Sequence, residues 1–333
     1  MAANFWELQR KARKKTAIYL TLFIFLTFSM AILLEFTMRN LAPDTYQADF
    51  PLLGVGFLGL TFGVAAFQYS MFQSFGGKYV AKSVGGRLIP RDTNNPKERL
   101  LLNIVEEIAL ASSLPTPPVY LLNARQINAF AAGLQQNSAI IAVTYGAIES
   151  LNRDELQGVI AHEFGHIYNR DMRINMQLAA MIMGFFFVLY FAFRLFQFSG
   201  LMGGGRRQSD DKRGGNPIVL AALLLMGAGA ATWLAGSILK AMVSREREYL
   251  ADACAVQFTR NPDGIANALR KISKEQINDM PKEGIAYSHM YLDNHQGLSA
   301  LFATHPPLDK RIKAILGLDY LPQEWKDDLR SRK

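Results

Sequence analysis

Residues 162–166 read His-Glu-Phe-Gly-His, which places two imidazoles and one carboxylate within five positions. On a helix, residues four apart lie on the same face about one turn from each other, so His162 and His166 can bind one metal ion. Glu163 then lies beside them, within reach of a water at that metal. This combination of residue types suits hydrolysis assisted by a single zinc ion. The alternative is a polar helix that carries two histidines by chance.

A helix at this position is supported by the residues around the motif. Asn152 is a suitable N-cap, and Leu156, Val159 and Ile160 recur at helical spacing. The chain has only five histidines, and two of them flank a glutamate at metal-binding spacing. We therefore favour the metal site over chance.

A zinc site that catalyses hydrolysis needs a third protein ligand and leaves its fourth position to water. Residues 244–252 offer three acids, Glu246, Glu248 and Asp252. Glu248 and Asp252 are four apart and share a helix face, so Glu248 can bind the metal while Asp252 accepts the second ring N–H of a ligand histidine. Glu246 has Leu250 four residues later and gains no such partner. The alternative for this stretch is an exposed helix whose acids pair with its arginines.

Four segments, in this order along the chain, resemble the M48 metallopeptidases, and most closely the HtpX-type membrane proteases of bacteria. They are NAFAAG at 128–133, HEFGHIYNRD at 162–171, SREREYLADA at 244–253 and THPPLDKR at 304–311. The resemblance covers about residues 95–175 and 240–315. It implies an α+β, mainly α-helical fold: a membrane-anchored, gluzincin-like zinc peptidase domain with a small sheet and about four transmembrane helices.

The resemblance also implies roles for residues that spacing alone does not distinguish. His305 is similar to a family histidine that helps to hold the scissile carbonyl oxygen as it becomes negative, and Asn128 resembles its partner from the opposite side. Without the resemblance, His305 would be assigned to a helix cap and Asn128 to a turn. The family's role is the cleavage of misfolded or damaged membrane proteins on the cytoplasmic side during stress.

The composition indicates a membrane protein with an attached soluble domain. Half of the 333 residues are hydrophobic, the mean hydropathy is +0.07 and the net charge is +8. Basic residues flank apolar runs instead of alternating with aromatic residues on one face, which argues against nucleic-acid binding. The single cysteine, Cys254, excludes an intramolecular disulfide and a zinc cluster built on cysteines. We expect Cys254 to be a small buried residue.

Four apolar runs are long enough to cross a bilayer: 17–34, 50–75, 176–193 and 216–239. The first follows five basic residues and lacks a signal-peptide cleavage site, so we interpret it as a retained helix with a cytoplasmic flank. The third and fourth runs return the chain to the same side, as a shared metal site requires. The loop between them is net positive, which argues against export and leaves a shallow hairpin as the alternative.

These runs divide the chain into four parts. Residues 1–76 form an N-terminal transmembrane hairpin, 77–175 the first part of the protease domain, 176–240 a second hairpin, and 241–333 the second part of the protease domain. The resemblance implies a bacterial inner-membrane location, with protein or peptide substrates and the lipid bilayer as partners. The basic flanks indicate that the active site faces the cytoplasm.

A small sheet is predicted ahead of the zinc helix. Three short β-prone runs lie at 119–122, 127–131 and 139–144. An exposed edge strand can pair with an extended substrate backbone, and we assign that edge to residues 139–144. The alternative is an ordinary core strand. Downstream, His289 and His295 are interpreted as surface histidines that could compete as ligands.

Two other functions fit parts of the sequence. An intramembrane protease also uses H-E-x-x-H, but there the motif lies within an apolar span, whereas here charged residues flank it on both sides. A membrane scaffold or transporter with a non-catalytic metal site is the alternative that is not an enzyme. It predicts that Glu163→Gln leaves function intact.

Overall fold

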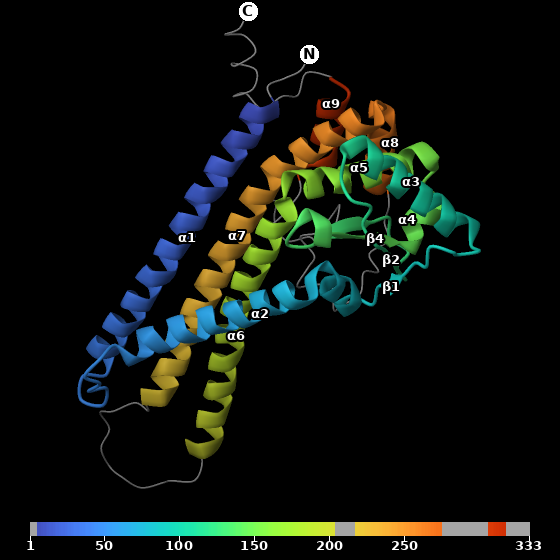
Figure 1. Ribbon diagram of the computed structural model, residues 1–333. Coiled ribbons are helices and arrows are strands. Elements are labelled where there is room, and N and C mark those ends of the chain that lie inside the picture. The colour runs from blue at the N-terminus through green and yellow to red at the C-terminus, as the bar shows by residue number, and fades with distance from the viewer. Residues whose placement is uncertain (1–4, 204–216, 275–305, 318–333) are drawn as a thin grey trace, which may run out of the picture. The chain divides into compact units, whose positions relative to one another are not determined.

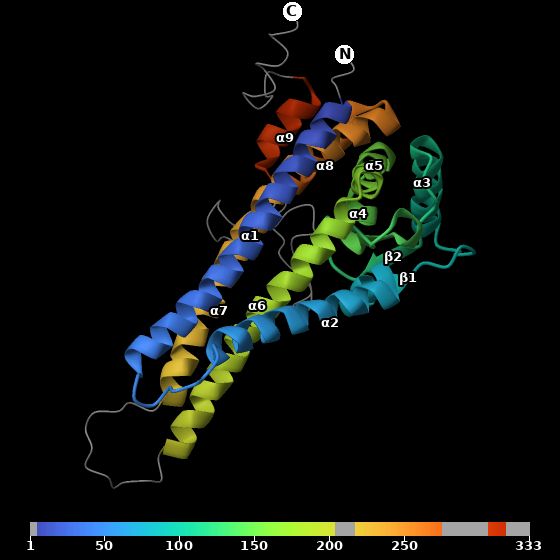
Figure 2. The same ribbon diagram turned by 60° about the vertical axis from the view of Figure 1, so that its left-hand side comes forward.

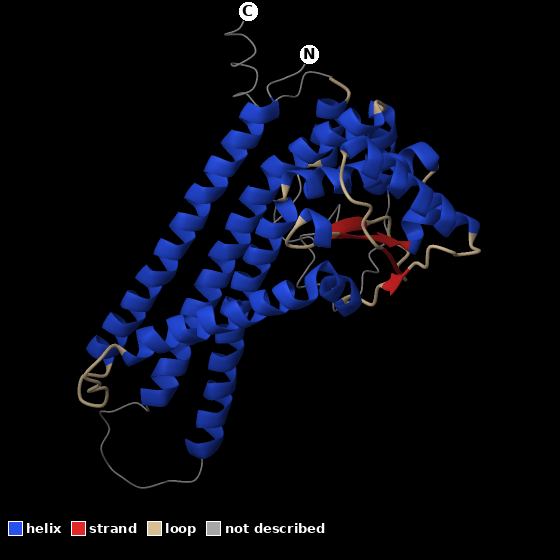
Figure 3. Ribbon diagram, in the orientation of Figure 1, coloured by secondary structure: helices blue, strands red, loops and turns tan. Residues whose placement is uncertain are grey.

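The fold was examined in a computed structural model that describes residues 5–203, 217–274 and 306–317. Within these residues the elements are α1 (Phe5–Leu41), α2 (Leu52–Ser83), β1 (Arg87–Leu88), α3 (Pro96–Ser112), β2 (Val119–Leu122), β3 (Ala129–Ala132), the 3₁₀-helix η1 (Gln136–Ser138), β4 (Ile140–Thr144), α4 (Tyr145–Ser150), α5 (Arg153–Asn169), α6 (Asp171–Gly203), α7 (Pro217–Thr259), α8 (Pro262–Lys274) and α9 (Leu308–Ile315) (Figure 1). The predicted fold class, mainly helical with a small sheet, is confirmed (Figure 3).

The chain divides into two compact units. Unit 1 contains residues 1–12, 71–176 and 241–333, and unit 2 contains residues 13–70 and 177–240. Each unit therefore gathers segments that are far apart in the sequence. The boundary between them falls inside helices α1, α2, α6 and α7.

Unit 2 is built from parts of four long helices around one apolar cluster. Its buried members include Phe23 of α1, Phe57 of α2, Phe185 of α6 and Leu225 of α7. Glycines allow the helices to approach closely. A Cβ on Gly184 of α6 would lie 2.4 Å from the carbonyl oxygen of Thr61 of α2. Figures 1 and 2 both show α2 running across α6.

Four helices in the described part of the chain are long and apolar enough to cross a membrane. The candidate spans are Thr16–Leu41, Leu52–Ser83, Asp171–Ser199 and Pro217–Thr259. The parts of α6 and α7 that belong to unit 2, within residues 177–240, each exceed the roughly 20 residues that a crossing needs. Their length and composition suit complete crossing.

The sheet in unit 1 has the strand order β1-β2-β4-β3. Strand β4 pairs with β2 in parallel and with β3 antiparallel, and β1 pairs antiparallel with β2. The three predicted strands are present, but the assignment of residues 139–144 to an edge was wrong. β4 lies inside the sheet and its five residues are all buried, as expected of a strand covered on both faces. The edges are β1 and β3.

The residues of the sheet alternate between two buried faces. Val119, Ala129, Ile141 and Val143 belong to a core shared with α3, α5 and α8. The alternate residues, which include Phe130 and Ile140, are equally buried. In unit 1, α3 and α5 lie on one side of the sheet and the end of α2 on the other (Figures 1 and 3).

The end of α2 reaches the sheet through two adjacent glycines. Gly76 has φ 59° and ψ −153°, a conformation that breaks the helix and that residues with a Cβ rarely adopt. A Cβ on Gly77 would lie 2.2 Å from the carbonyl oxygen of Ala132, so only glycine permits this approach. Residues 76–95 thus contain the last turns of α2 and strand β1.

Candidate metal centre

Helix α5, which carries the H-E-x-x-H residues, is capped at its N-terminus. The side chain of Asn152 accepts a hydrogen bond from the backbone N–H of Glu155, and the Glu155 carboxylate accepts one from the backbone N–H of Asn152, which is a complete capping box. The predicted N-cap is therefore confirmed. The helix ends at Asn169, and the left-handed backbone of the C-cap residue Arg170 (φ 60°) lets α6 begin immediately at Asp171. The chain thereby turns sharply just after His166.

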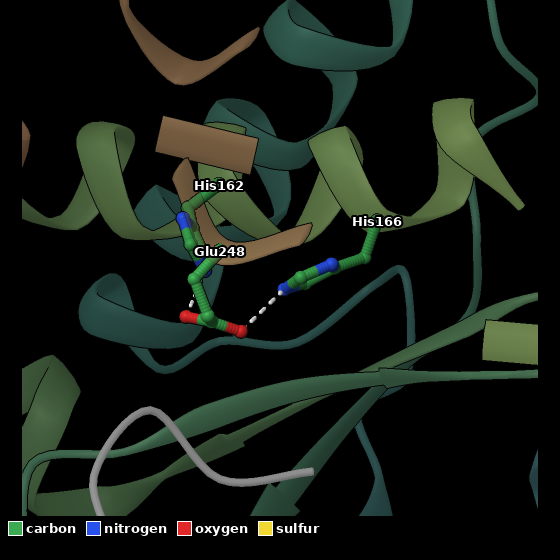
Figure 4. A group of neighbouring side chains, drawn as sticks. All are labelled: His162, His166 and Glu248. Carbon is green, nitrogen blue, oxygen red and sulfur yellow. Dashed lines mark ion pairs between the residues drawn. The ribbon is translucent and has the colours of Figure 1, made fainter. Parts of the chain in front are cut away.

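Three side chains converge from α5 and α7. One donor atom from each of His162, His166 and Glu248 lies within 4.8 Å of the others (Figure 4). The Nε2 atom of His162 is 3.5 Å from one Glu248 oxygen, and the Nε2 atom of His166 is 3.4 Å from the other. His162 and Glu248 are buried, and the His166 side chain is 13% exposed. The three residues chosen from the sequence are therefore neighbours in space.

Each histidine is held by a carboxylate on its other ring nitrogen. The Nδ1 atom of His162 is 2.9 Å from Oδ1 of Asp252, the partner predicted for a ligand histidine. The Nδ1 atom of His166 is 3.1 Å from Oδ2 of Asp171. An acceptor at Nδ1 fixes the ring orientation and leaves Nε2 available, as outer partners of metal-binding histidines do.

The arrangement can hold one metal ion. The Nε2 atoms of His162 and His166 lie 3.5 and 3.4 Å from different oxygens of the Glu248 carboxylate, close to the separation of about 3.4 Å between two ligand atoms of a zinc ion with bonds of about 2.1 Å. The Nε2 atom of His162 is buried and makes no hydrogen bond within the described residues. Buried polar atoms normally have a partner, so this atom indicates a ligand.

The local charges also favour a cation. Burial lowers the pKa of His162, but its contacts with Asp252 and Glu248 outweigh burial and raise that pKa above its usual value. The same balance, with Asp171 and Glu248 as partners, raises the pKa of His166 well above its usual value. The carboxylates thus create a field in which positive charge at the histidines is stabilised.

The chain is similar to proteins of a known family. A model of peptidase family M48 matches residues 95–319, a range that contains all of these side chains. The chain belongs to peptidase family M48. Relatives named Protease HtpX homolog include one from Caldanaerobacter subterraneus subsp. tengcongensis, 35% identical over 94% of this chain and 97% of the relative, and one from Thermoanaerobacter pseudethanolicus, 34% identical over 94% and 97%. The crystal structure of S. mikatae Ste24p is a more distant match, with TM-score 0.43, 18% identity, and coverage of 79% of this chain and 62% of that one.

The family, these relatives and the four apolar helices together make the chain a membrane metallopeptidase. The resemblance found in the sequence is confirmed. The scaffold or transporter alternative is not favoured.

Other residues predicted for the M48 site have definite positions. Glu163 is 3% exposed and accepts a hydrogen bond from the backbone of Ala131 in β3. Asn128 is buried at the start of β3, where its side-chain oxygen accepts from the backbone N–H of Ala129. Cys254 is buried, as expected. His289, His295 and His305 lie outside the described residues, and so does most of the loop predicted between the third and fourth apolar runs.

Three charged residues of the site were missed by the sequence analysis. Asp171 contacts His166 and also forms an ion pair with Arg247 of α7. Arg311 of α9 forms ion pairs with both Asp252 and Glu248. Asp171 follows His166 by five residues, and on a continuous helix a side chain at that spacing would point away from His166. Nothing in the sequence distinguishes Arg311 from the neighbouring lysines.

Gly165, one of the two variable positions of the motif, determines how closely α7 approaches α5. A Cβ on Gly165 would lie 2.9 Å from Cα of Ala251, which is between Glu248 and Asp252 in the sequence. We expect Gly165→Ala to cost about 1–3 kcal/mol of stability through overpacking and to weaken metal binding by displacing α7. The thermal unfolding midpoint and the zinc dissociation constant measure the two effects.

Gly158 provides a matched control on the same helix. Its Cβ would lie 2.5 Å from the backbone nitrogen of Ile265, so Gly158→Ala disturbs α8 and leaves α7 in place. We expect a comparable loss of stability with zinc affinity close to wild type. Equal losses of affinity in the two variants would contradict the specific role of Gly165.

Proposed function

We propose that the metal is zinc, one per chain, held by His162, His166 and Glu248, and that the protein is an endopeptidase. Two imidazoles and one carboxylate with an open fourth position form a common catalytic zinc site. The observation that carries the proposal is the convergence of the three donor atoms beside the buried Glu163. When bound, zinc supplies a Lewis acid that activates water and polarises the scissile carbonyl.

The residues around the metal have separate roles in the proposed hydrolysis. Glu163 removes a proton from the attacking water and transfers it to the leaving amine. Burial raises the pKa of its carboxyl group, while the nearby histidines oppose this shift. A raised pKa brings a carboxylate closer to the range in which it accepts and returns a proton near neutral pH. Asn128 and His305 donate hydrogen bonds to the carbonyl oxygen as it gains negative charge.

The substrate is proposed to bind beside β3, which replaces β4 as the edge strand. β3 is the terminal strand of the sheet on this side, and the backbone of Ala131 is hydrogen bonded to Glu163. An extended peptide there would place its backbone near the proposed base.

We propose that the site faces the cytoplasm of a bacterial cell and that the substrates are misfolded or damaged membrane proteins. The basic residues before the first apolar run and after the second support this orientation. The residues before the first run are Arg10, Lys11, Arg13, Lys14 and Lys15, and those after the second run are Lys78, Lys82, Arg87 and Arg91. The relatives named Protease HtpX homolog are bacterial proteins, which supports the location.

The test measures metal content and cleavage of an unfolded model protein by the detergent-purified chain. We expect one zinc per chain, loss of cleavage after chelation, and recovery on addition of one equivalent of Zn²⁺ but not of Mg²⁺. Magnesium prefers oxygen ligands in octahedral geometry, which this donor set does not offer. Cleavage that survives chelation, or a purified protein that binds no zinc, would refute the proposal.

A further inference from the structure

Arg311 is a fully buried arginine on the short helix α9. Its side chain is 0% exposed. Because arginine is rarely buried unless it is paired, Arg311 should have partners in the interior. Its Nε atom donates to Oδ2 of Asp252 at 2.9 Å, and its Nη2 atom donates to Oδ1 at 2.8 Å. Two parallel bonds of this kind fix both the position and the plane of a carboxylate. Asp252 is thus held in one orientation from the side of α9.

The same guanidinium reaches the proposed metal ligands. Its Nη1 atom is 3.1 Å from Oε2 of Glu248, and its Nη2 atom is 3.5 Å from Nδ1 of His162. Oδ1 of Asp252 is therefore shared between Arg311 and His162. One side chain of α9 contacts two of the three proposed ligands and the carboxylate that orients one of them.

We propose that Arg311 is a positioning residue of the metal centre, which makes α9 a necessary part of that centre. The inference depends on the metal site proposed above. A buried positive charge near a cation site opposes metal binding electrostatically. The contribution of Arg311 is consequently geometric: it aligns Asp252, and through it His162, and it holds Glu248. A lysine carries the same charge but lacks the planar fork that makes these contacts together.

The position of α9 links this contact to the packing of unit 1. The apolar side chains of Leu308, Ile312 and Ile315 pack against the core that includes α5 and α8. Arg311 points from the same helix to the metal ligands. Docking of α9 and binding of the metal should therefore stabilise each other by the same factor.

The experiment uses the full-length protein in detergent and compares wild type with Arg311→Lys, Arg311→Met and Arg270→Met. Arg270 is an exposed arginine of α8 that bonds locally to Asn267, and it serves as the control. Zinc affinity is measured by competition with a chromophoric chelator, and site geometry by the visible absorption of the Co²⁺-substituted protein. Hydrogen exchange of residues 308–315 is followed with and without Zn²⁺.

We expect Arg311→Lys to weaken zinc binding by about 10–100-fold, the usual effect of losing an outer partner, and to alter the Co²⁺ spectrum. Zinc should slow exchange in α9 of the wild type and have a smaller effect in Arg311→Lys. Arg270→Met should match the wild type. Because Arg311→Met leaves a buried carboxylate without its cation, its folding is checked by thermal unfolding of the metal-free protein, and Arg311→Lys provides the decisive comparison.

The outcomes separate this inference from the metal site itself. Wild-type zinc affinity and a wild-type Co²⁺ spectrum in Arg311→Lys would overturn the positioning role, and so would tighter zinc binding. Either result would mean that Arg311 only neutralises the buried carboxylates. A wild-type protein that binds no zinc would overturn the metal centre and the role of Arg311 with it.

Discussion

Glu163→Gln is expected to reduce peptide hydrolysis by about two to four orders of magnitude, the usual contribution of a general base, with zinc content unchanged. Glutamine has the same size as glutamate, so the buried position 163 keeps its packing and its contact with β3. It cannot accept a proton from water. The turnover number with an unfolded protein substrate and the zinc content of the purified variant are the two measurements.

Glu155→Gln is the matched control, because it makes the same chemical change on the same helix. Glu155 belongs to the N-terminal capping box of α5 and pairs with Lys271 of α8. The variant should lose some stability and retain hydrolysis. A Glu163→Gln protein with more than a tenth of wild-type turnover would show that Glu163 is not the base. Loss of zinc in that variant would mean that Glu163 supports metal binding.

Glu248→Gln is expected to have the largest effect on metal binding. The change replaces the only anionic donor among the three proposed ligands with a neutral amide. The loss of zinc affinity should therefore exceed the roughly 10–100-fold that follows removal of an outer partner. Cleavage should fall to background with it. Equilibrium competition for zinc and cleavage at a fixed free-zinc concentration measure these effects.

Glu246→Gln tests the same ligand assignment from the other side. Glu246 is two residues away on α7, and it was the competing acid in the sequence. Residues two apart on a helix do not face the same way, so only one of the two can meet the histidines. Wild-type zinc affinity is expected for Glu246→Gln. The reverse result, with zinc lost in Glu246→Gln and kept in Glu248→Gln, would move the third ligand to Glu246.

The sequence alone predicted those features that depend on local spacing. The cap at Asn152, the common face of His162 and His166, and the common face of Glu248 and Asp252 all follow from helical periodicity over a few residues. The apolar spans are equally local, because each must contain enough consecutive apolar residues to cross a bilayer.

Strand order was decided only by the tertiary structure. The run 139–144 is apolar throughout, which fits both an edge strand against a core and a central strand covered on two sides. Pairing with β2 on one side and β3 on the other, together with the α2 residues that follow Gly76, places it inside the sheet. Pairing of this kind depends on chain segments that local patterns do not connect.

The charged residues behind the metal ligands were also decided by the fold. Arg247 meets Asp171 across 76 positions, and Arg311 meets Asp252 across 59. Such contacts depend on the packing of α6, α7 and α9. An arginine that will be buried looks the same in the sequence as one that will be exposed. The sequence by itself therefore determined which residues are proposed as metal ligands. The tertiary structure decided which residues hold them in place, because that support comes from helices that only folding brings together.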